Sequence, residues 1–241
     1  MAVVAVDPSS PFTGGAILGD RIRMQRHIDD RGVFVRSMAN RGRLGGLATG
    51  VSPVLSVLAA AGFDELLVET VGVGQAEVEI AEEADTTIVV VNPRWGDAMQ
   101  AAKAGLLEIA DVFVVNKADL PGVDDTVRDL EGMLELAPAS AWTPPIVTTV
   151  ATTGEGVAEV VDAVVAHRAV TQRSGEAEVR RRQRARTEIL HAVESRLRSR
   201  IRALPNLDAA VVAAVAEGTI DPWTVADRLL AAADGAEEAT E

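Results

Sequence analysis

Four residues, Asn116-Lys117-Ala118-Asp119, directly follow the apolar segment Val112–Val115, and their types suit recognition of a guanine base. The aspartate carboxylate can accept both N–H donors on the guanine edge, while the asparagine amide can bond a base acceptor and tie neighbouring loops together. The lysine stem can lie along the base plane. Such a site rejects adenine, because the wrong base leaves buried polar groups unpaired. The alternative interpretation is a surface turn at a strand end.

A second candidate is the segment LLVETVGVGQ, residues 66–75, in which an apolar strand ends at Glu69 and a turn with two glycines follows. A carboxylate in this position can hold Mg²⁺ directly or through water. Gly72 can bring its backbone N–H close to a terminal phosphate, since it has no side chain in the way. The alternative is a glycine-rich turn that binds nothing.

The segment from Val6 to Met24 is long and rich in small polar residues. It is typical of a mobile loop that folds over a nucleotide and its metal. Asp7 and Asp20 are candidate metal carboxylates, and Arg23 is a candidate phosphate or partner contact. The alternative is an ordinary loop in which Asp20 caps a helix.

Residues 92–105 border the same predicted crevice, because they begin where the apolar run 86–91 ends. Asp97, Gln100 and Lys103 recur at helical spacing and therefore share one face. An exposed Trp95 in such a loop indicates a partner contact or simple packing. The loop 150–157, VATTGEGV, is a weaker candidate, in which Val150 and Ala151 line the base with backbone N–H groups.

A phosphate-binding loop of the form Gly-x-x-x-x-Gly-Lys-Ser/Thr is absent from the printed sequence. That loop cradles nucleotide phosphates with its backbone N–H groups and its lysine. The chain contains no Gly-Lys pair, and the glycine-rich stretch 41–50, RGRLGGLATG, has no lysine. The candidate residues for base recognition and for metal binding therefore lack the phosphate-binding loop that usually accompanies them.

Short runs of β-branched residues alternate with segments of helical pattern. These predicted strands and helices position the candidate site residues. The predicted strands are Val3–Val6, Val33–Arg36, Glu65–Glu69, Thr86–Val91, Val112–Asn116 and Ile146–Val150, and the predicted helices include Pro53–Ala61, Asp97–Glu108 and Asp124–Leu136. Continuous apolar strands that alternate with helices predict an α/β fold with a mostly parallel sheet covered on both faces. Ligands of such sheets bind at the carboxyl ends of the strands, where the candidate residues lie.

Composition excludes several classes of protein. The chain has 241 residues and 48% hydrophobic residues, enough for one sizeable core with an appendage. Its net charge of −13 argues against general binding to nucleic acids or anionic membranes. It has no cysteine, which fits a reducing compartment, and no apolar run long enough to span a membrane. We therefore expect a cytoplasmic protein.

Composition changes near His167, which predicts a domain of residues 1–168 followed by a helical arm, residues 169–241, with a frayed polar end. The Arg-rich run 180–186, RRRQRAR, lies in a helical pattern from Glu176 to Arg202. We interpret it as a solvated or partner-facing helix rather than a nucleic-acid patch, because interleaved aromatic residues are absent.

Together, the motifs DPSSPFTGGAILGDR (residues 7–21), VETVGVGQ (68–75) and NKAD (116–119) resemble the MeaB/ArgK family, the methylmalonyl-CoA mutase-associated GTPases, also described as LAO/AO transport system ATPases. The resemblance is close over about residues 2–168 and loose in the tail. It implies a P-loop GTPase domain of the SIMIBI type with a helical dimerisation arm. It also implies a G-protein chaperone that uses GTP and Mg²⁺ to assist an adenosylcobalamin-dependent acyl-CoA mutase, and a homodimer.

The resemblance also implies roles for individual residues. Asp20 and Glu69 match Mg²⁺-site carboxylates of the family, with Asp7 in the same loop, and Gly72 matches the turn that senses the γ-phosphate. The residues Asn116, Lys117 and Asp119 match the base-specificity motif, and Asp97 and Lys103 match a switch loop that meets the mutase.

The chain departs from the family at three places. The family's PGxGD motif reads Pro93-Arg94-Trp95-Gly96-Asp97, its base-side Ser-Ala reads Val150-Ala151, and its N-terminal block with the phosphate loop is missing. We expect that block upstream of Met1, as with a misplaced start site or a truncated gene product. For the chain as printed, we expect weak nucleotide affinity and little or no GTP hydrolysis. The alternatives are a non-hydrolysing dimeric scaffold for a mutase, a metallochaperone GTPase and, less favoured, a nucleotide kinase.

Overall fold

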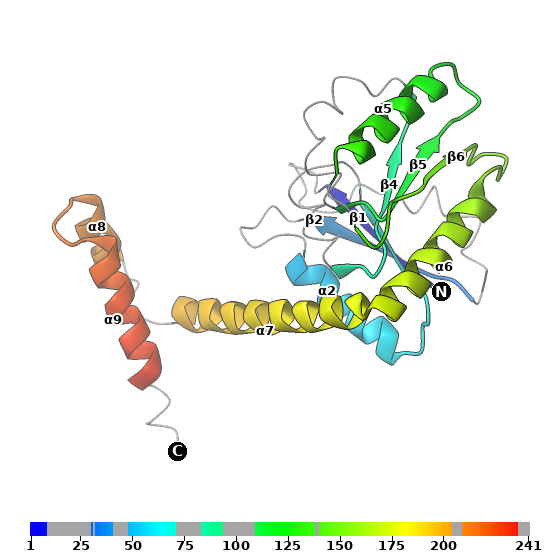
Figure 1. Ribbon diagram of the computed structural model, residues 1–241. Coiled ribbons are helices and arrows are strands. Elements are labelled where there is room, and N and C mark those ends of the chain that lie inside the picture. The colour runs from blue at the N-terminus through cyan, green and yellow to red at the C-terminus, as the bar shows by residue number, and fades with distance from the viewer. Residues whose placement is uncertain are drawn as a thin grey trace. The chain divides into compact units, whose positions relative to one another are not determined.

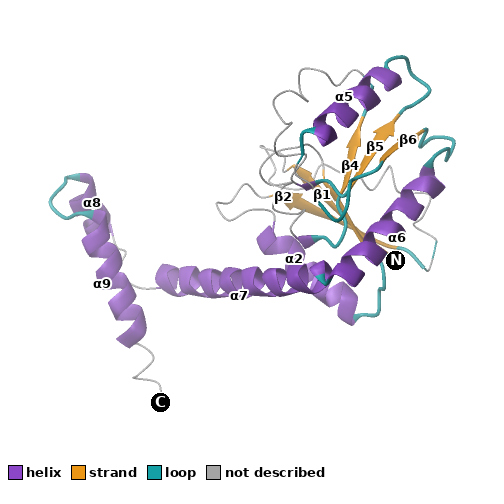
Figure 2. Ribbon diagram, in the orientation of Figure 1, coloured by secondary structure: helices purple, strands orange, loops and turns teal. Residues whose placement is uncertain are grey.

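The computed structural model describes residues 1–8, 30, 32–40, 48–70, 83–93, 109–137, 140–203 and 209–235. The chain divides into two compact units, Met1–Arg184 and Ala185–Glu241. Parallel strands and their covering helices form the first unit (Figures 1 and 2). Residue 168, where the sequence predicted a domain boundary, lies inside a continuous helix of this unit.

The first sheet contains three parallel strands, β1 (Ala2–Pro8), β2 (Phe34–Asn40) and β3 (Leu66–Thr70), in the order β2-β1-β3. The central strand is buried from Ala2 to Val6, as its apolar run requires. Helix α2 (Ala48–Ala60) covers one face, where Val51 and Leu58 pack against β1.

Helix α2 begins before the proline at which the sequence predicted its start. Pro53 lies in the second turn of α2 and cannot donate a backbone hydrogen bond there. Val51, two residues earlier and on the side facing the sheet, is fully buried in the core. Burial of this side chain offsets the missing bond, so the helix extends past the position that local preference alone would choose.

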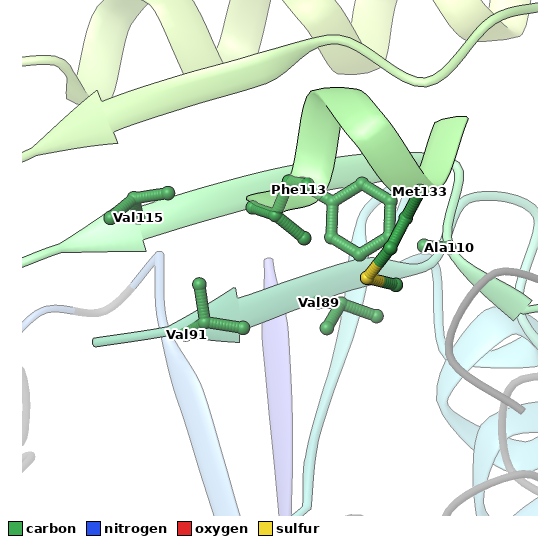
Figure 3. Packing of buried hydrophobic residues seen from close by; sticks show 7 residues of the cluster. Val89, Val91, Ala110, Phe113, Val115 and Met133 are labelled. Carbon is green, nitrogen blue, oxygen red and sulfur yellow. The ribbon is translucent and has the colours of Figure 1, made fainter. Parts of the chain in front are cut away.

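The second sheet contains β4 (Ile88–Val91), β5 (Val112–Asn116) and β6 (Ile146–Thr149), also parallel, in the order β4-β5-β6. Helix α5 (Val123–Glu135) packs on one face, with Met133 beside Phe113 (Figure 3), and Leu130 belongs to the same buried cluster. Phe113 and Leu130 have no exposed surface, which contributes about 1.5–3 kcal/mol each. Helix α6 (Val157–Ser174) lies on the other side of this sheet (Figure 1).

The α/β class with parallel sheets, predicted from the sequence, is confirmed. Each predicted strand coincides with an observed one, and only the ends differ by a few residues. The predicted helix 124–136 corresponds to α5, whereas the predicted helix 97–108 lies outside the described residues.

The second unit is helical. Helix α7 (Glu176–Ala203) begins in the first unit and continues into the second, which also contains α8 (Ala209–Ala216) and α9 (Pro222–Gly235). Asp221 caps α9 by accepting hydrogen bonds from the Thr224 hydroxyl and from the N–H groups of Thr224 and Trp223, and these bonds lower the pKa of Asp221. In the described segments, no helix combines the length and the apolar character needed to cross a membrane.

Candidate functional site

The turn after β5 is hydrogen-bonded to the neighbouring strand β6. The N–H of Ala118 donates to the carbonyl of Thr149 at 2.9 Å, and the N–H of Leu120 donates to the carbonyl of Lys117 at 3.0 Å. Lys117 itself has φ 61°, the left-handed region that non-glycine residues rarely adopt. Strained backbone of this kind concentrates at functional sites and persists because its surroundings hold it in place.

The Asn116 side chain has a fixed orientation at the end of β5. Its Oδ1 accepts a hydrogen bond from the Thr149 hydroxyl at 3.2 Å and one from the N–H of Ala151 at 3.1 Å. In the described part of the chain, no group accepts a hydrogen bond from its Nδ2. The amide therefore offers two N–H donors to a ligand beside the turn.

Lys117 and Asp119 are exposed on the same turn. The structure therefore brings together five predicted base-site residues, Asn116, Lys117, Asp119, Val150 and Ala151, around the ends of β5 and β6. Asp119 supplies carboxylate acceptors, and Asn116 supplies amide donors. A ligand edge with two N–H groups and a nearby acceptor, as in guanine, matches this set.

The loop after β6 closes on itself. The N–H of Val150 donates to the carbonyl of Glu155 at 3.0 Å, and the hydroxyl of Thr153 donates to the carbonyl of Val150 at 3.0 Å. The sequence predicted that backbone N–H groups of Val150 and Ala151 face the base. In this structure those two N–H groups are bonded to Glu155 and Asn116, so their role toward a ligand stays a prediction.

Glu69 lies near the end of β3 and has a buried Oε2 without a hydrogen-bond partner among the described residues. A buried carboxylate oxygen is costly unless a cation or a donor reaches it. Asp7 lies at the end of the adjacent strand β1, since Val6 is in register with Thr70. Oxygen ligands at two neighbouring strand ends fit a hard cation such as Mg²⁺.

The remaining predicted site residues lie outside the described part of the chain. These are Asp20, Arg23, Gly72, Asp97, Gln100 and Lys103. The side chain of Asp7 is also not described, although its backbone belongs to β1. Their roles stay predictions.

A buried cluster at the opposite end of the second sheet was not predicted from the sequence. Asp111, just before β5, accepts two hydrogen bonds from Arg180 of α7, both 3.2 Å long, and one from the N–H of Thr87 at 2.8 Å. Its Oδ1 lies 3.2 Å from Nε2 of His167, which is fully buried in α6. Trp142 donates from Nε1 to the Asp111 carbonyl at 2.7 Å.

This cluster contains a threonine, a histidine and an aspartate, as hydrolytic triads do. The Thr86 hydroxyl lies 2.9 Å from Nδ1 of His167, on the ring side opposite Asp111. However, His167 has no exposed surface, and the contact between its Nε2 and Asp111 lacks hydrogen-bond geometry. The cluster also lies at the amino ends of the strands, away from the edge where ligands bind. We therefore assign it a structural role.

Acidification is expected to destabilise the protein through His167. Burial lowers the pKa of His167 below its ordinary value of 6.5; Asp111, Glu176 and Asp85 oppose this shift, and Arg180 adds to it. The unfolded chain then binds a proton that the folded protein does not, so stability falls as the pH decreases below about 6.5 and levels off below the folded pKa. We expect a loss of up to about 1 kcal/mol, measured by urea denaturation at pH 7.5 and 5.5.

The matched variant for this measurement is His167→Gln, which cannot be protonated. Its stability should depend less on pH than that of the native protein over the same interval. An equal dependence in both proteins would assign the effect to other groups.

Near this cluster, a cavity of about 410 Å³ is lined by Asp85, Arg168, Thr171, Gln172, Gly175, Ala177, Glu178, Arg180, Arg181 and Arg184. Each arginine is paired with an acid: Arg168 with Glu65, Arg180 with Asp111 and Glu176, Arg181 with Glu178, and Arg184 with Asp85. The guanidinium groups are thus already neutralised, and the cavity does not select an anion. The predicted helix over residues 176–202 is confirmed, and part of its arginine run serves these pairs.

Comparison with known proteins gives a consistent result. Residues 1–206 match the family described as methylmalonyl Co-A mutase-associated GTPase MeaB. A Pyrococcus abyssi protein with a provisional GTPase description is 47% identical over 236 residues, which is 95% of this chain and 73% of that protein. GTPase ArgK of Escherichia coli is 37% identical over 192 residues, 77% of this chain and 57% of that protein.

A more distant relative is the mouse protein described as methylmalonic aciduria type A homolog, mitochondrial. It is 29% identical over 240 residues, 96% of this chain and 58% of that protein. Among solved structures, HypB from Helicobacter pylori in complex with nickel covers 69% of this chain and 74% of its own, with a TM-score of 0.49 and 14% identity. A likeness at that level says nothing about function.

Proposed function

Because the chain belongs to the MeaB family of methylmalonyl-CoA mutase-associated GTPases, we propose that it binds guanine nucleotides and serves as a G-protein chaperone for an adenosylcobalamin-dependent acyl-CoA mutase. The observation that supports guanine binding is the Asn116 amide, whose donors have no acceptor among the described residues and lie on the same turn as the exposed carboxylate of Asp119. The mutase part rests on the name of the family.

In the proposed base site, Asp119 accepts the ring N–H and the exocyclic N–H of guanine, and Asn116 donates to a base acceptor. The Lys117 stem lies along the base plane. Adenine presents a different edge and leaves the carboxylate of Asp119 without its paired donors. The site therefore selects guanine by an energetic penalty on the wrong base as much as by attraction to the right one.

The proposed metal is Mg²⁺, held by Glu69 with Asp7 and Asp20. The buried oxygen of Glu69, which has no hydrogen-bond partner among the described residues, supports this assignment, since it needs a positive partner. When bound, Mg²⁺ neutralises charge on phosphate oxygens. Gly72 is the proposed contact to the terminal phosphate, and Arg23 a further phosphate contact.

The proposed partner surface is the segment with Asp97, Gln100 and Lys103, which would meet the mutase. Residues 169–241 are the proposed dimerisation arm of a homodimer. The cytoplasm is the proposed location, in keeping with the absence of cysteine from the sequence.

A second candidate function is favoured by one observation, the absence of a Gly-Lys pair from the printed sequence. Without a phosphate cradle, the chain would act as a non-hydrolysing dimeric scaffold that binds the mutase. The two candidates differ in one result. Capture of the mutase that is independent of added GDP or GTP favours the scaffold, and capture that requires nucleotide favours the G-protein chaperone.

The proposed function predicts a preference for guanine. We expect the full chain to bind GDP at least about tenfold more tightly than ADP, because the site depends on paired hydrogen bonds. Isothermal titration at high nucleotide concentration measures this, since we expect the absolute affinity to be weak. Equal binding of GDP and ADP would contradict the assignment.

The informative variant is Asp119→Asn. It should lose the preference for GDP and favour xanthosine diphosphate, whose base carries a carbonyl acceptor where guanine carries an amino donor. The exposed Asp124, at the start of α5, provides a matched control, because Asp124→Asn removes a similar charge nearby without touching the turn.

A further inference from the structure

We propose that the buried hydroxyl of Thr149 holds the Asn116 amide in the direction that the N–H of Ala151 selects, which makes Thr149 a positioning residue for base recognition. This inference rests on the guanine-binding function proposed above and names a residue outside the base-specificity motif.

The direction of the amide follows from the chemistry of its neighbours. The backbone N–H of Ala151 can only donate, so the Asn116 atom 3.1 Å from it must be the carbonyl oxygen. A flipped amide would bring an NH₂ group against that N–H and leave both donors unsatisfied. The Thr149 hydroxyl, 3.2 Å from the same oxygen, adds the second bond.

Thr149 is held in place by the sheet. It is in register with Asn116 between β5 and β6, and its side chain is buried. Its carbonyl also accepts the N–H of Ala118 at 2.9 Å. One residue of β6 therefore contacts the base motif twice, once through its backbone and once through its hydroxyl.

The two donors differ in how firmly they are placed. Ala151 is the first residue of an exposed loop, whereas Thr149 belongs to a strand with a buried side chain. The Ala151 N–H determines which atom of the amide faces inward, and the Thr149 hydroxyl holds that oxygen against the buried strand. Loss of the hydroxyl would let the amide rotate, so that its donors point toward a base for only part of the time.

Three substitutions separate this role from simple packing. Thr149→Val keeps the shape and removes the hydroxyl, Thr149→Ser keeps the hydroxyl and removes the methyl group, and Thr148→Val changes the exposed neighbouring threonine as a control. If the hydroxyl positions Asn116, Thr149→Val should weaken GDP binding about fivefold to tenfold, as expected for one lost hydrogen bond. Thr149→Ser should retain most of the affinity.

A double-mutant cycle tests whether the effect passes through Asn116. In an Asn116→Ala background, Thr149→Val should change GDP affinity less than twofold, because the group it positions is absent. An undiminished effect in that background would overturn the proposal. So would the reverse order of the single variants, in which Thr149→Ser weakens binding and Thr149→Val does not.

A measurement without nucleotide keeps the inference separate from the guanine function. The side-chain NH₂ resonances of Asn116, assigned by their loss in Asn116→Ala, report the setting of the amide by NMR. In Thr149→Val they should move toward the shifts of freely rotating asparagines, and in Thr149→Ser they should stay near their native positions. If the resonances shift but the protein shows no preference for GDP over ADP, Thr149 positions the amide and the guanine function is refuted. Unchanged resonances in Thr149→Val would overturn the positioning role itself.

Discussion

Gly156→Ala should destabilise the first unit by about 3 kcal/mol or more, one of the two largest effects that we expect from a single substitution. An added Cβ at this position would lie 2.1 Å from the Thr148 carbonyl oxygen and 3.0 Å from Cα of Thr149. Backbone cannot move out of the way as a side-chain tip can. Gly156 also has φ +78°, which costs an alanine about 1–2 kcal/mol by itself.

A neighbouring glycine separates these two causes. Gly154 has φ +84°, but nothing lies within 4 Å of an added Cβ there. Gly154→Ala should therefore cost only about 1–2 kcal/mol. Urea denaturation of both variants gives the comparison, and equal losses would mean that close approach to β6 contributes nothing.

Gly156→Ala should also disturb the base site. To relieve the contact, the loop must move away from β6, and Ala151 lies on that loop. Its hydrogen bond to Asn116 should lengthen or break. We therefore expect a loss of GDP affinity in the part of the Gly156→Ala sample that remains folded.

Asp111→Ala should destabilise the first unit by about 3–5 kcal/mol, the range found when one partner is removed from a buried ion pair. The carboxylate is the acceptor for Arg180 and for the N–H of Thr87, and it lies beside the buried His167. Alanine would leave the N–H of Thr87 without its acceptor and would remove two hydrogen bonds of the Arg180 guanidinium, which would keep only its pairing with Glu176. The free energy of unfolding from urea denaturation measures the loss.

Two further variants test that explanation. Asp111→Ala combined with Arg180→Met should lose less stability than the sum of the two single losses, because both substitutions remove the same ion pair. Asp125→Ala, which breaks the exposed pair with Arg128, should cost less than about 1 kcal/mol. A double variant as unstable as the sum would show that the two groups act independently.

The sequence by itself determined the class of fold and the position of the turn that we propose binds the base. Both depend on local information: the apolar run Val112–Val115 gives a buried parallel strand, and the four residues that follow it form one turn. The end of helix α5 could also be predicted from the sequence, because its apolar residues recur at helical spacing. The start of α2 was not, because burial of Val51 overrides the local preference around Pro53.

Only the tertiary structure decided which residues support the motif. Thr149 is 33 residues from Asn116, and Arg180 is 69 residues from Asp111, and no spacing in the sequence connects either pair. The register of β5 with β6 makes the first pair, and the packing of α6 and the start of α7 on the sheet makes the second. Local sequence patterns determine whether a segment forms a helix, a strand or a turn. Hydrogen bonds between distant segments depend on how the whole core packs, which no local pattern specifies.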